Sequence, residues 1–278
     1  MIPFDFDYYR PATVQEAVSL YARLDREGKR PLYWSGGTEI ATFARWNRIY
    51  TEAVIDLKAV PECRALTVGD REMTFGSALS LSEIHDSGAF PLLGETGGGI
   101  ADRTSRNKIT LGGNVCSRMI YKEAVLPLLL ADSDVLVAGA SGVRRVPIGR
   151  LFDRSMRIGR GEFLVQFVMD AGYRTMPYAS VKKRKASAIE YPIVTVAALA
   201  TGSGIRFAFS GLCDFPFRSA EMERILNRRE LPAGERIRQA AARLPAPVIG
   251  DIKASAEYRK WVWTITTEDV LKALEPQA

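Results

Sequence analysis

Two glycine pairs in the first half of the chain constrain its fold more than any other feature. The SGGT segment at residues 35–38 follows an apolar, strand-like stretch at 32–34 and precedes a helix-like stretch at 39–46. The second pair lies in the TLGGN segment at 110–114. A Gly-Gly pair flanked by Ser, Thr or Asn lets main-chain N–H groups approach an anion, because no Cβ atom blocks the way. Two such loops, the first at the start of a helix, predict a diphosphate-bearing cofactor held from two sides.

The cysteine and histidine content limits the chemistry of the chain. Cys63, Cys116 and Cys213 lie far apart and are too few for an iron–sulfur cluster or a zinc site. The single histidine, His85, stands in a helix-like stretch, where we expect a surface or half-buried residue. We therefore expect no metal site and no catalytic residue, and a redox function would need an organic cofactor here and any metal on another chain. Cys116 is expected to be a small buried residue.

The length and charge of the chain limit the classes of protein to which it can belong. A chain of 278 residues is long for one core, so two or three subdomains are expected. The net charge is +6, and the basic residues are scattered apart from the run at 182–185, which favours docking to an acidic protein over nucleic-acid binding. No apolar run reaches about 18 residues. Residues 1–5 lack the pattern of a signal peptide, so we expect a cytoplasmic protein.

Hydrophobic periodicity and capping residues predict an alternation of helices and strands up to residue 171, followed by a distinct C-terminal part. Strands are expected at 32–34, 53–57, 65–68, 72–75, 134–138, 143–146 and 162–169. Helices are expected at 13–24, 39–46, 82–87, 91–103 and 124–131. After a linker at 172–177, we expect an antiparallel pair at 192–199 and 205–209, then helices at 218–228, 234–243, 255–263 and 267–274. Strands followed by helices predict an α+β lobe.

Several motifs, taken in order, resemble those of the FAD-binding subunits of molybdenum hydroxylases. This group includes the medium subunits of bacterial xanthine dehydrogenase and aerobic carbon monoxide dehydrogenase. The matching segments are FDYYRP at 6–11, SGGTE at 35–39 (similar to AGGTD), IDL at 55–57, FGS at 75–77, RN at 106–107, TLGGN at 110–114 (similar to TIGGN) and SAEYR at 255–259. The resemblance covers nearly the whole chain.

The resemblance implies an α+β fold. Its first part is a two-part FAD-binding domain of the vanillyl-alcohol-oxidase and molybdenum-hydroxylase flavoprotein type, followed by a C-terminal α+β lobe with an antiparallel sheet and helices. We place the N-terminal FAD-binding subdomain at 1–55, the second FAD-binding subdomain at 56–171 and the C-terminal domain at 175–278.

The resemblance also implies which residues bind FAD. They are Leu32, Tyr33, Trp34, Ser35, Gly36, Gly37, Thr38, Glu39, Thr110, Leu111, Gly112, Gly113, Asn114, Glu123, Leu164, Lys182 and Tyr191. Glu123 stands where the family more often has Asp after small residues and proline, and Tyr191 falls where the family places a residue over the isoalloxazine ring. Leu164 has an alternative interpretation as a strand core residue, Lys182 as a solvated charge at a strand edge, and Tyr191 as a packing residue between lobes.

By resemblance, the chain relays electrons as one subunit of a complex. It would receive them from iron–sulfur clusters on a small subunit, which are reduced by a molybdopterin large subunit, and pass them through non-covalently bound FAD to NAD or another acceptor. The cofactor carries that chemistry, and the protein binds and orients it. Two alternatives stay open: a stand-alone FAD-dependent reductase, and a flavin-free structural or assembly subunit of the same fold.

Overall fold

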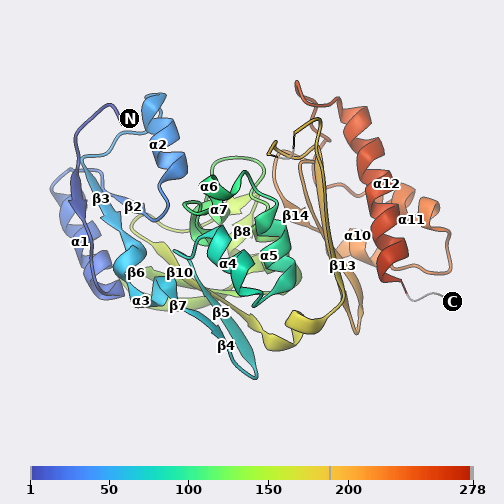
Figure 1. Cartoon of the computed structure of the whole chain (residues 1–278), viewed down its shortest axis with the longest axis horizontal. Coiled ribbons are helices and arrows are strands. Elements are labelled where there is room, and N and C mark those ends of the chain that lie inside the picture. Colours follow the sequence, from blue (N-terminus) through green and yellow to red (C-terminus); the bar gives the residue numbers. More distant parts are fainter. Residues whose placement is uncertain (1, 188, 276–278) are drawn as a thin grey trace.

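The computed structural model describes residues 2–187 and 189–275, which form three larger sheets that follow one another along the chain, and one two-stranded ribbon (Figure 1). The first is a three-stranded parallel sheet in the order β1-β3-β2. Its elements are β1 (Asp7–Tyr9), α1 (Val14–Arg26), β2 (Leu32–Trp34), α2 (Thr38–Arg45) and β3 (Ala53–Asp56). Parallel strands need helical crossovers, which α1 and α2 supply. The Thr13 hydroxyl caps α1 by accepting from the Glu16 N–H, as the sequence predicts.

The middle sheet has five antiparallel strands in the order β4-β5-β10-β6-β7. Its strands are β4 (Leu66–Val68), β5 (Glu72–Gly76), β6 (Asp134–Gly139), β7 (Gly142–Pro147) and β10 (Phe163–Asp170). The helices of this part are η1 (Leu57–Ala59), α3 (Pro61–Arg64), α4 (Leu81–Ser87), α5 (Pro91–Gly98), α6 (Arg103–Arg106), α7 (Leu111–Val115), α8 (Val125–Leu130) and α9 (Ile148–Leu151). A small ribbon of β8 (Phe152–Asp153) and β9 (Ser155–Met156) completes it.

The helix predicted at 91–103 is two shorter helices. A run of three glycines ends α5, since glycine is a poor helix former. The chain begins helix α6 only after Asp102, whose carboxylate accepts from the Ser105 N–H.

The C-terminal sheet has four antiparallel strands in the order β11-β12-β13-β14. Its elements are η2 (Ala171–Thr175) at the predicted linker, β11 (Tyr178–Lys183), β12 (Val194–Thr201), β13 (Gly204–Ser210), β14 (Phe217–Arg218), α10 (Ala220–Leu226), α11 (Ala233–Ala241) and α12 (Ala256–Leu274). The two helices predicted at 255–263 and 267–274 are one continuous helix. No glycine or proline interrupts the stretch between them, and the Thr264 hydroxyl bonds back to the Lys260 carbonyl instead of breaking the helix.

The middle sheet lies between the other two and shares a core with each. Neighbouring residues of β10 point to opposite faces: Phe163 packs with the first sheet, and Leu164 packs with the helices of the middle part. Leu199 of β12 joins the core of the middle part. Within the described residues, the helices are too short or too polar for any of them to span a bilayer. The subdomain limits of 1–55, 56–171 and 175–278 stay a prediction.

Candidate functional site

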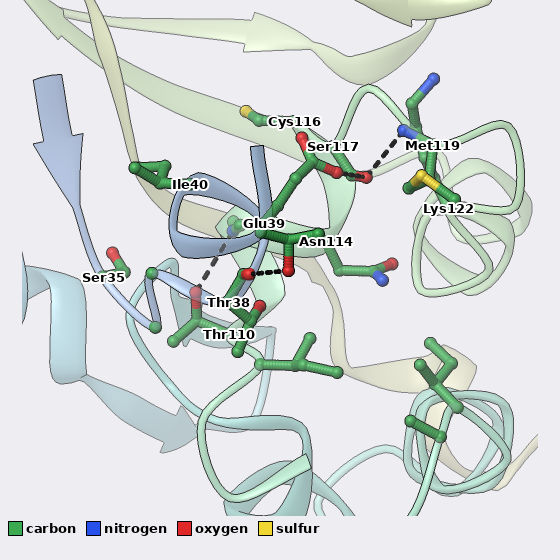
Figure 2. Close-up of a pocket in the computed structure, with 18 of the residues that line it drawn as sticks. Ser35, Thr38, Glu39, Ile40, Thr110, Asn114, Cys116, Ser117, Met119 and Lys122 are labelled. Atoms are coloured by element: carbon green, nitrogen blue, oxygen red, sulfur yellow. Dashed lines mark hydrogen bonds between the residues drawn. The ribbon is translucent and has the colours of Figure 1, made fainter. Parts of the chain in front are cut away.

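A cavity of about 620 Å³ opens where all three parts of the chain meet (Figure 2). Its volume is in the range of about 300–1,000 Å³ that is typical of cofactor and ligand sites. The predicted cofactor residues in its wall are Tyr33, Ser35, Gly36, Gly37, Thr38, Glu39, Thr110, Gly112, Gly113, Asn114, Glu123, Leu164, Lys182 and Tyr191. The tertiary structure therefore brings together residues that lie more than 150 positions apart in the sequence.

Three of the predicted residues do not line this cavity. Leu111 is fully buried in the core of the middle part. Leu32 is half-buried in β2. Trp34 lines a separate cavity of about 520 Å³ on the other side of the first glycine loop.

The first glycine loop presents free main-chain donors. Within the part of the chain that the structure describes, the N–H groups of Gly36, Gly37 and Thr38 donate to no protein acceptor. They stand at the N-terminus of α2, where unpaired N–H groups and the helix dipole favour an anion. A Cβ on Gly36 would lie 1.7 Å from the Lys108 carbonyl oxygen, so only glycine lets the two loops touch. Free donors beside a close-packed glycine fit a diphosphate.

The N–H groups of the second glycine loop already donate hydrogen bonds to other atoms of the protein. Leu111 donates to the Leu79 carbonyl at 2.9 Å and Gly112 to the Ser77 carbonyl at 2.8 Å. Gly113 donates to the Thr110 hydroxyl at 3.3 Å. The prediction that N–H groups converge from both loops is therefore wrong for the second loop, which lines the cavity but offers its side chains and glycine surface instead.

The Glu39 side chain links α2, which follows the first glycine loop, to the segment that follows α7. Its carboxylate accepts from the Ser117 hydroxyl, which Figure 2 shows beside it, and from the Arg118 N–H at 2.9 Å. Glu39 is in the first turn of α2, whereas Ser117 follows α7 of the middle part. Cys116, in the same segment, is exposed in the cavity wall, so the expectation of a buried cysteine is wrong.

A buried ion pair forms another part of the wall. The Lys182 ammonium donates to the Glu123 carboxylate at 2.7 Å and to the Gly99 carbonyl at 2.9 Å. Glu123 also accepts from the Thr195 hydroxyl at 2.6 Å. Burial raises the pKa of Glu123 and lowers the pKa of Lys182, while their mutual attraction opposes both shifts. The alternative of Lys182 as a solvated edge charge is wrong, because its side chain is only 9% exposed.

Two tyrosines stack in the cavity wall near the C-terminal part. The rings of Tyr121 and Tyr191 are 4.9 Å apart and nearly parallel. The Lys253 ammonium lies 4.6 Å from the Tyr191 ring, within the range of a cation–π contact. Sequence reasoning missed Tyr121 and Lys253. Neither belongs to a motif, and the only available signal was the position of Tyr121 two residues before Glu123.

The acidic, histidine and cysteine side chains do not gather into a metal site within residues 2–187 and 189–275. The single histidine lies in α4, where its Nδ1 pairs with the Gly94 carbonyl oxygen at 3.0 Å. The features of this cavity that fit a cofactor are thus the three free N–H donors of the first loop and the glycine surfaces of both loops.

Comparisons with known proteins agree with this geometry. A family model described as the FAD binding domain in molybdopterin dehydrogenase matches residues 4–169. The chain is 24% identical to the glyceraldehyde dehydrogenase medium chain of Sulfolobus acidocaldarius, over 98% of this chain and 99% of the relative. It is 27% identical to the xanthine dehydrogenase FAD-binding subunit of Escherichia coli O157:H7 over 52% of this chain, and that match spans only about half (50%) of the relative's length.

A solved structure of carbon monoxide dehydrogenase from Hydrogenophaga pseudoflava superposes on 99% of this chain and 98% of its own, with a TM-score of 0.87 and 22% identity. The α+β fold, the family and the cofactor predicted from the sequence are confirmed. Because the matched residues make up more than half of the sequence, the chain belongs to the family of FAD-binding domains of molybdopterin dehydrogenases, and FAD is its cofactor.

Proposed function

We propose that this chain is the FAD-binding electron-transfer subunit of a molybdenum hydroxylase complex. The single observation that carries the proposal is the set of free N–H groups on Gly36, Gly37 and Thr38 in the wall of the 620 Å³ cavity. When bound, FAD supplies one- and two-electron redox chemistry, which lets it accept electrons from iron–sulfur clusters and pass them to NAD or another acceptor.

The chain's own residues bind and orient the cofactor. We assign the diphosphate to the first glycine loop, because its free N–H groups attract a negative charge without the desolvation of a side chain. The second loop, at Thr110–Asn114 in sequence, would close the other side through its glycine surface and the side chains of Thr110 and Asn114. Glu123, Leu164, Lys182 and Tyr191 would contact the remainder of the cofactor, as the family resemblance implies.

The partner subunits are inferred from the metal-binding residues that this sequence lacks. Three widely separated cysteines cannot hold an iron–sulfur cluster, so the clusters and the molybdopterin belong to an iron–sulfur small subunit and a molybdopterin large subunit. Two relatives are named as a medium chain and as an FAD-binding subunit, which supports a multi-subunit arrangement. The cytoplasmic location stays a prediction.

A visible spectrum of the purified chain tests the cofactor, and activity assays and co-purification test the partners. We expect two absorbance bands of oxidised flavin, either at once or after added FAD, and release of the flavin by acid precipitation because the bond is non-covalent. The isolated chain should not oxidise a purine, an aldehyde or carbon monoxide, and it should co-purify from its source with an iron–sulfur subunit and a molybdopterin subunit. A colourless chain that fails to bind added FAD contradicts the proposed site. Hydroxylase turnover by the chain alone contradicts the relay and favours a stand-alone reductase.

A further inference from the structure

A network of three side chains lies behind the first glycine loop. The Lys58 ammonium donates to the Ser35 carbonyl oxygen and to the Asp56 Oδ2 atom, both at 2.7 Å. The Tyr8 hydroxyl donates to the same Oδ2 atom at 2.5 Å, and the Lys58 main-chain N–H donates to Oδ1 at 2.9 Å. Asp56 ends β3 and is 2% exposed, so its carboxylate is surrounded by donors rather than water.

The bond to Ser35 determines which way the loop presents its peptide groups. In a trans peptide, the C=O and N–H groups point in opposite directions. Lys58 holds the Ser35 carbonyl from the side of the smaller, 520 Å³ cavity, of which Lys58 is a wall residue. The Gly36 N–H belongs to the same peptide group, so it points away from Lys58. Gly36 and Gly37 line the larger cavity as well, and the Gly36 N–H donates to no acceptor among the residues that the structure describes.

The loop needs such a restraint because glycine residues allow many backbone conformations. A peptide group next to two glycines can rotate at low cost, and Gly37 already adopts a φ of +68°. A loop that samples several conformations must be ordered when the ligand binds, and that ordering reduces affinity. The contact from Lys58 removes the alternative in which the Ser35 carbonyl faces the larger cavity and repels a phosphate.

The network orients the loop and adds little net charge to the cofactor site. Burial opposes ionisation of Asp56, but hydrogen bonds from Lys58 and Tyr8 outweigh it and hold the pKa of Asp56 below its usual value. Hydrogen bonding to Asp56 also raises the pKa of Tyr8. At neutral pH the Lys58 cation is thus balanced by the Asp56 anion 2.7 Å away, and the pair offers the ligand little net charge.

We propose that Lys58, Asp56 and Tyr8 are positioning residues for the cofactor diphosphate, because they lock the Ser35–Gly36 peptide with its N–H group toward the larger cavity. This inference rests on the proposed FAD site. It assigns a role to the IDL segment at 55–57, which otherwise reads as the end of a buried strand.

The test measures FAD and ADP affinity of the full chain after removal of bound flavin. Lys58→Met should raise the Kd for FAD at least about tenfold, the loss expected for one charge-assisted hydrogen bond. The affinity for ADP, measured by competition with FAD, should fall by a similar factor because ADP carries the same diphosphate. Lys58→Met also removes one donor from the buried Asp56 carboxylate, so the melting temperature of the apoprotein should fall, and the Kd values are compared at a temperature where both proteins are folded. Lys58→Arg keeps a donor at this place and should recover part of the affinity.

Lys29→Met is the matched control. Lys29 also pairs with an aspartate of the same sheet, Asp7, at 2.6 Å, and its side chain is similarly exposed at 34%, but it makes no contact with the glycine loop. It should leave the Kd for FAD unchanged. Equal FAD affinity in Lys58→Met and the parent overturns the inference, as does an equal loss in the Lys29→Met control. A parent chain that binds neither FAD nor ADP contradicts the proposed site itself, so the two failures are distinguishable.

Discussion

At the scale of single residues, the glycines of the two loops are required for different reasons. Gly37 has a φ of +68°, and a Cβ there would lie 1.9 Å from the Trp34 ring. Gly113 does not have a positive φ, and a Cβ there would meet only the Thr110 hydroxyl, at 2.8 Å. Gly37 therefore needs glycine for its backbone conformation, whereas Gly113 does not. The substitutions should therefore differ in their effect on stability.

We expect Gly37→Val to abolish FAD binding and to destabilise the fold by about 2 kcal/mol or more, since it adds both backbone strain and a clash with Trp34. Gly113→Val should abolish FAD binding at a smaller cost of about 1 kcal/mol, because only the capping hydroxyl of Thr110 has to move. Urea unfolding and FAD titration of each variant check this. Gly28→Val controls for strain alone, because Gly28 has a φ of +78° and open space around it. If Gly113→Val binds FAD as the parent does, the second loop is only a turn.

At the scale of elements, the cap of α4 supports the second glycine loop. Ser80 and Glu83 form a capping box, with each side chain accepting from the other residue's main-chain N–H. The Leu81 N–H donates to the Ile109 carbonyl, and Ser80 pairs with Thr110 as an isolated bridge. Helix α4 therefore begins against the residues that open the second loop, and its cap helps to place them.

The pH dependence of this cap is testable. Hydrogen bonding from Arg64 lowers the pKa of Glu83 from 4.5 to about 2. A lowered folded-state pKa gives stability that is fully present above pH 4.5 and is lost as the pH falls toward 2. Glu83→Gln should thus destabilise the chain by about 1 kcal/mol at pH 7, a modest value because the side chain is 42% exposed. Thermal melts between pH 7 and pH 3 should show the difference shrinking with acidity. Glu62→Gln, an exposed neighbour on α3, is the control, and a difference that stays constant with pH contradicts the assignment.

At the scale of the whole molecule, the middle and C-terminal parts are joined by polar contacts, both exposed and buried, as well as by a shared core. Asp132 accepts from Arg206 at 2.8 Å and from Arg218 at 2.5 Å. Glu123 and Lys182 form their pair across the same boundary, with Glu123 just before α8 and Lys182 on β11. Because these contacts and the core of the middle part cross the boundary, we expect the two parts to unfold together.

A double-mutant cycle tests the buried pair. Lys182→Met or Glu123→Gln alone should cost about 3–5 kcal/mol, because each leaves the other partner buried without its counter-charge. The double variant should cost clearly less than the sum of the two. Denaturant unfolding gives the three differences in the free energy of unfolding, and Lys272→Met, which removes an exposed pair with Glu268, is the control. Additive costs contradict a direct coupling between Glu123 and Lys182.

Local features of this protein were predictable from the sequence. The capping residues Thr13 and Ser80 and the hairpins around residues 69–71 and 140–141 depend on contacts between near neighbours, so their signals lie within a few positions. The order of the motifs identified the family and its cofactor. Two local predictions failed: the helix expected at 91–103 is two helices, and the two helices expected at 255–263 and 267–274 are the single helix α12.

Only the tertiary structure decided which polar groups of the site are free. The sequence shows two similar glycine loops, yet the carbonyls of Ser77 and Leu79 accept the N–H groups of the second loop and leave those of the first unpaired. Likewise, Glu123 finds Lys182 and Thr195, which lie 59 and 72 positions away. The physical reason is that a donor is satisfied by whatever acceptor the fold places within about 3 Å of it. That acceptor can come from any part of the chain, so spacing along the sequence does not reveal it.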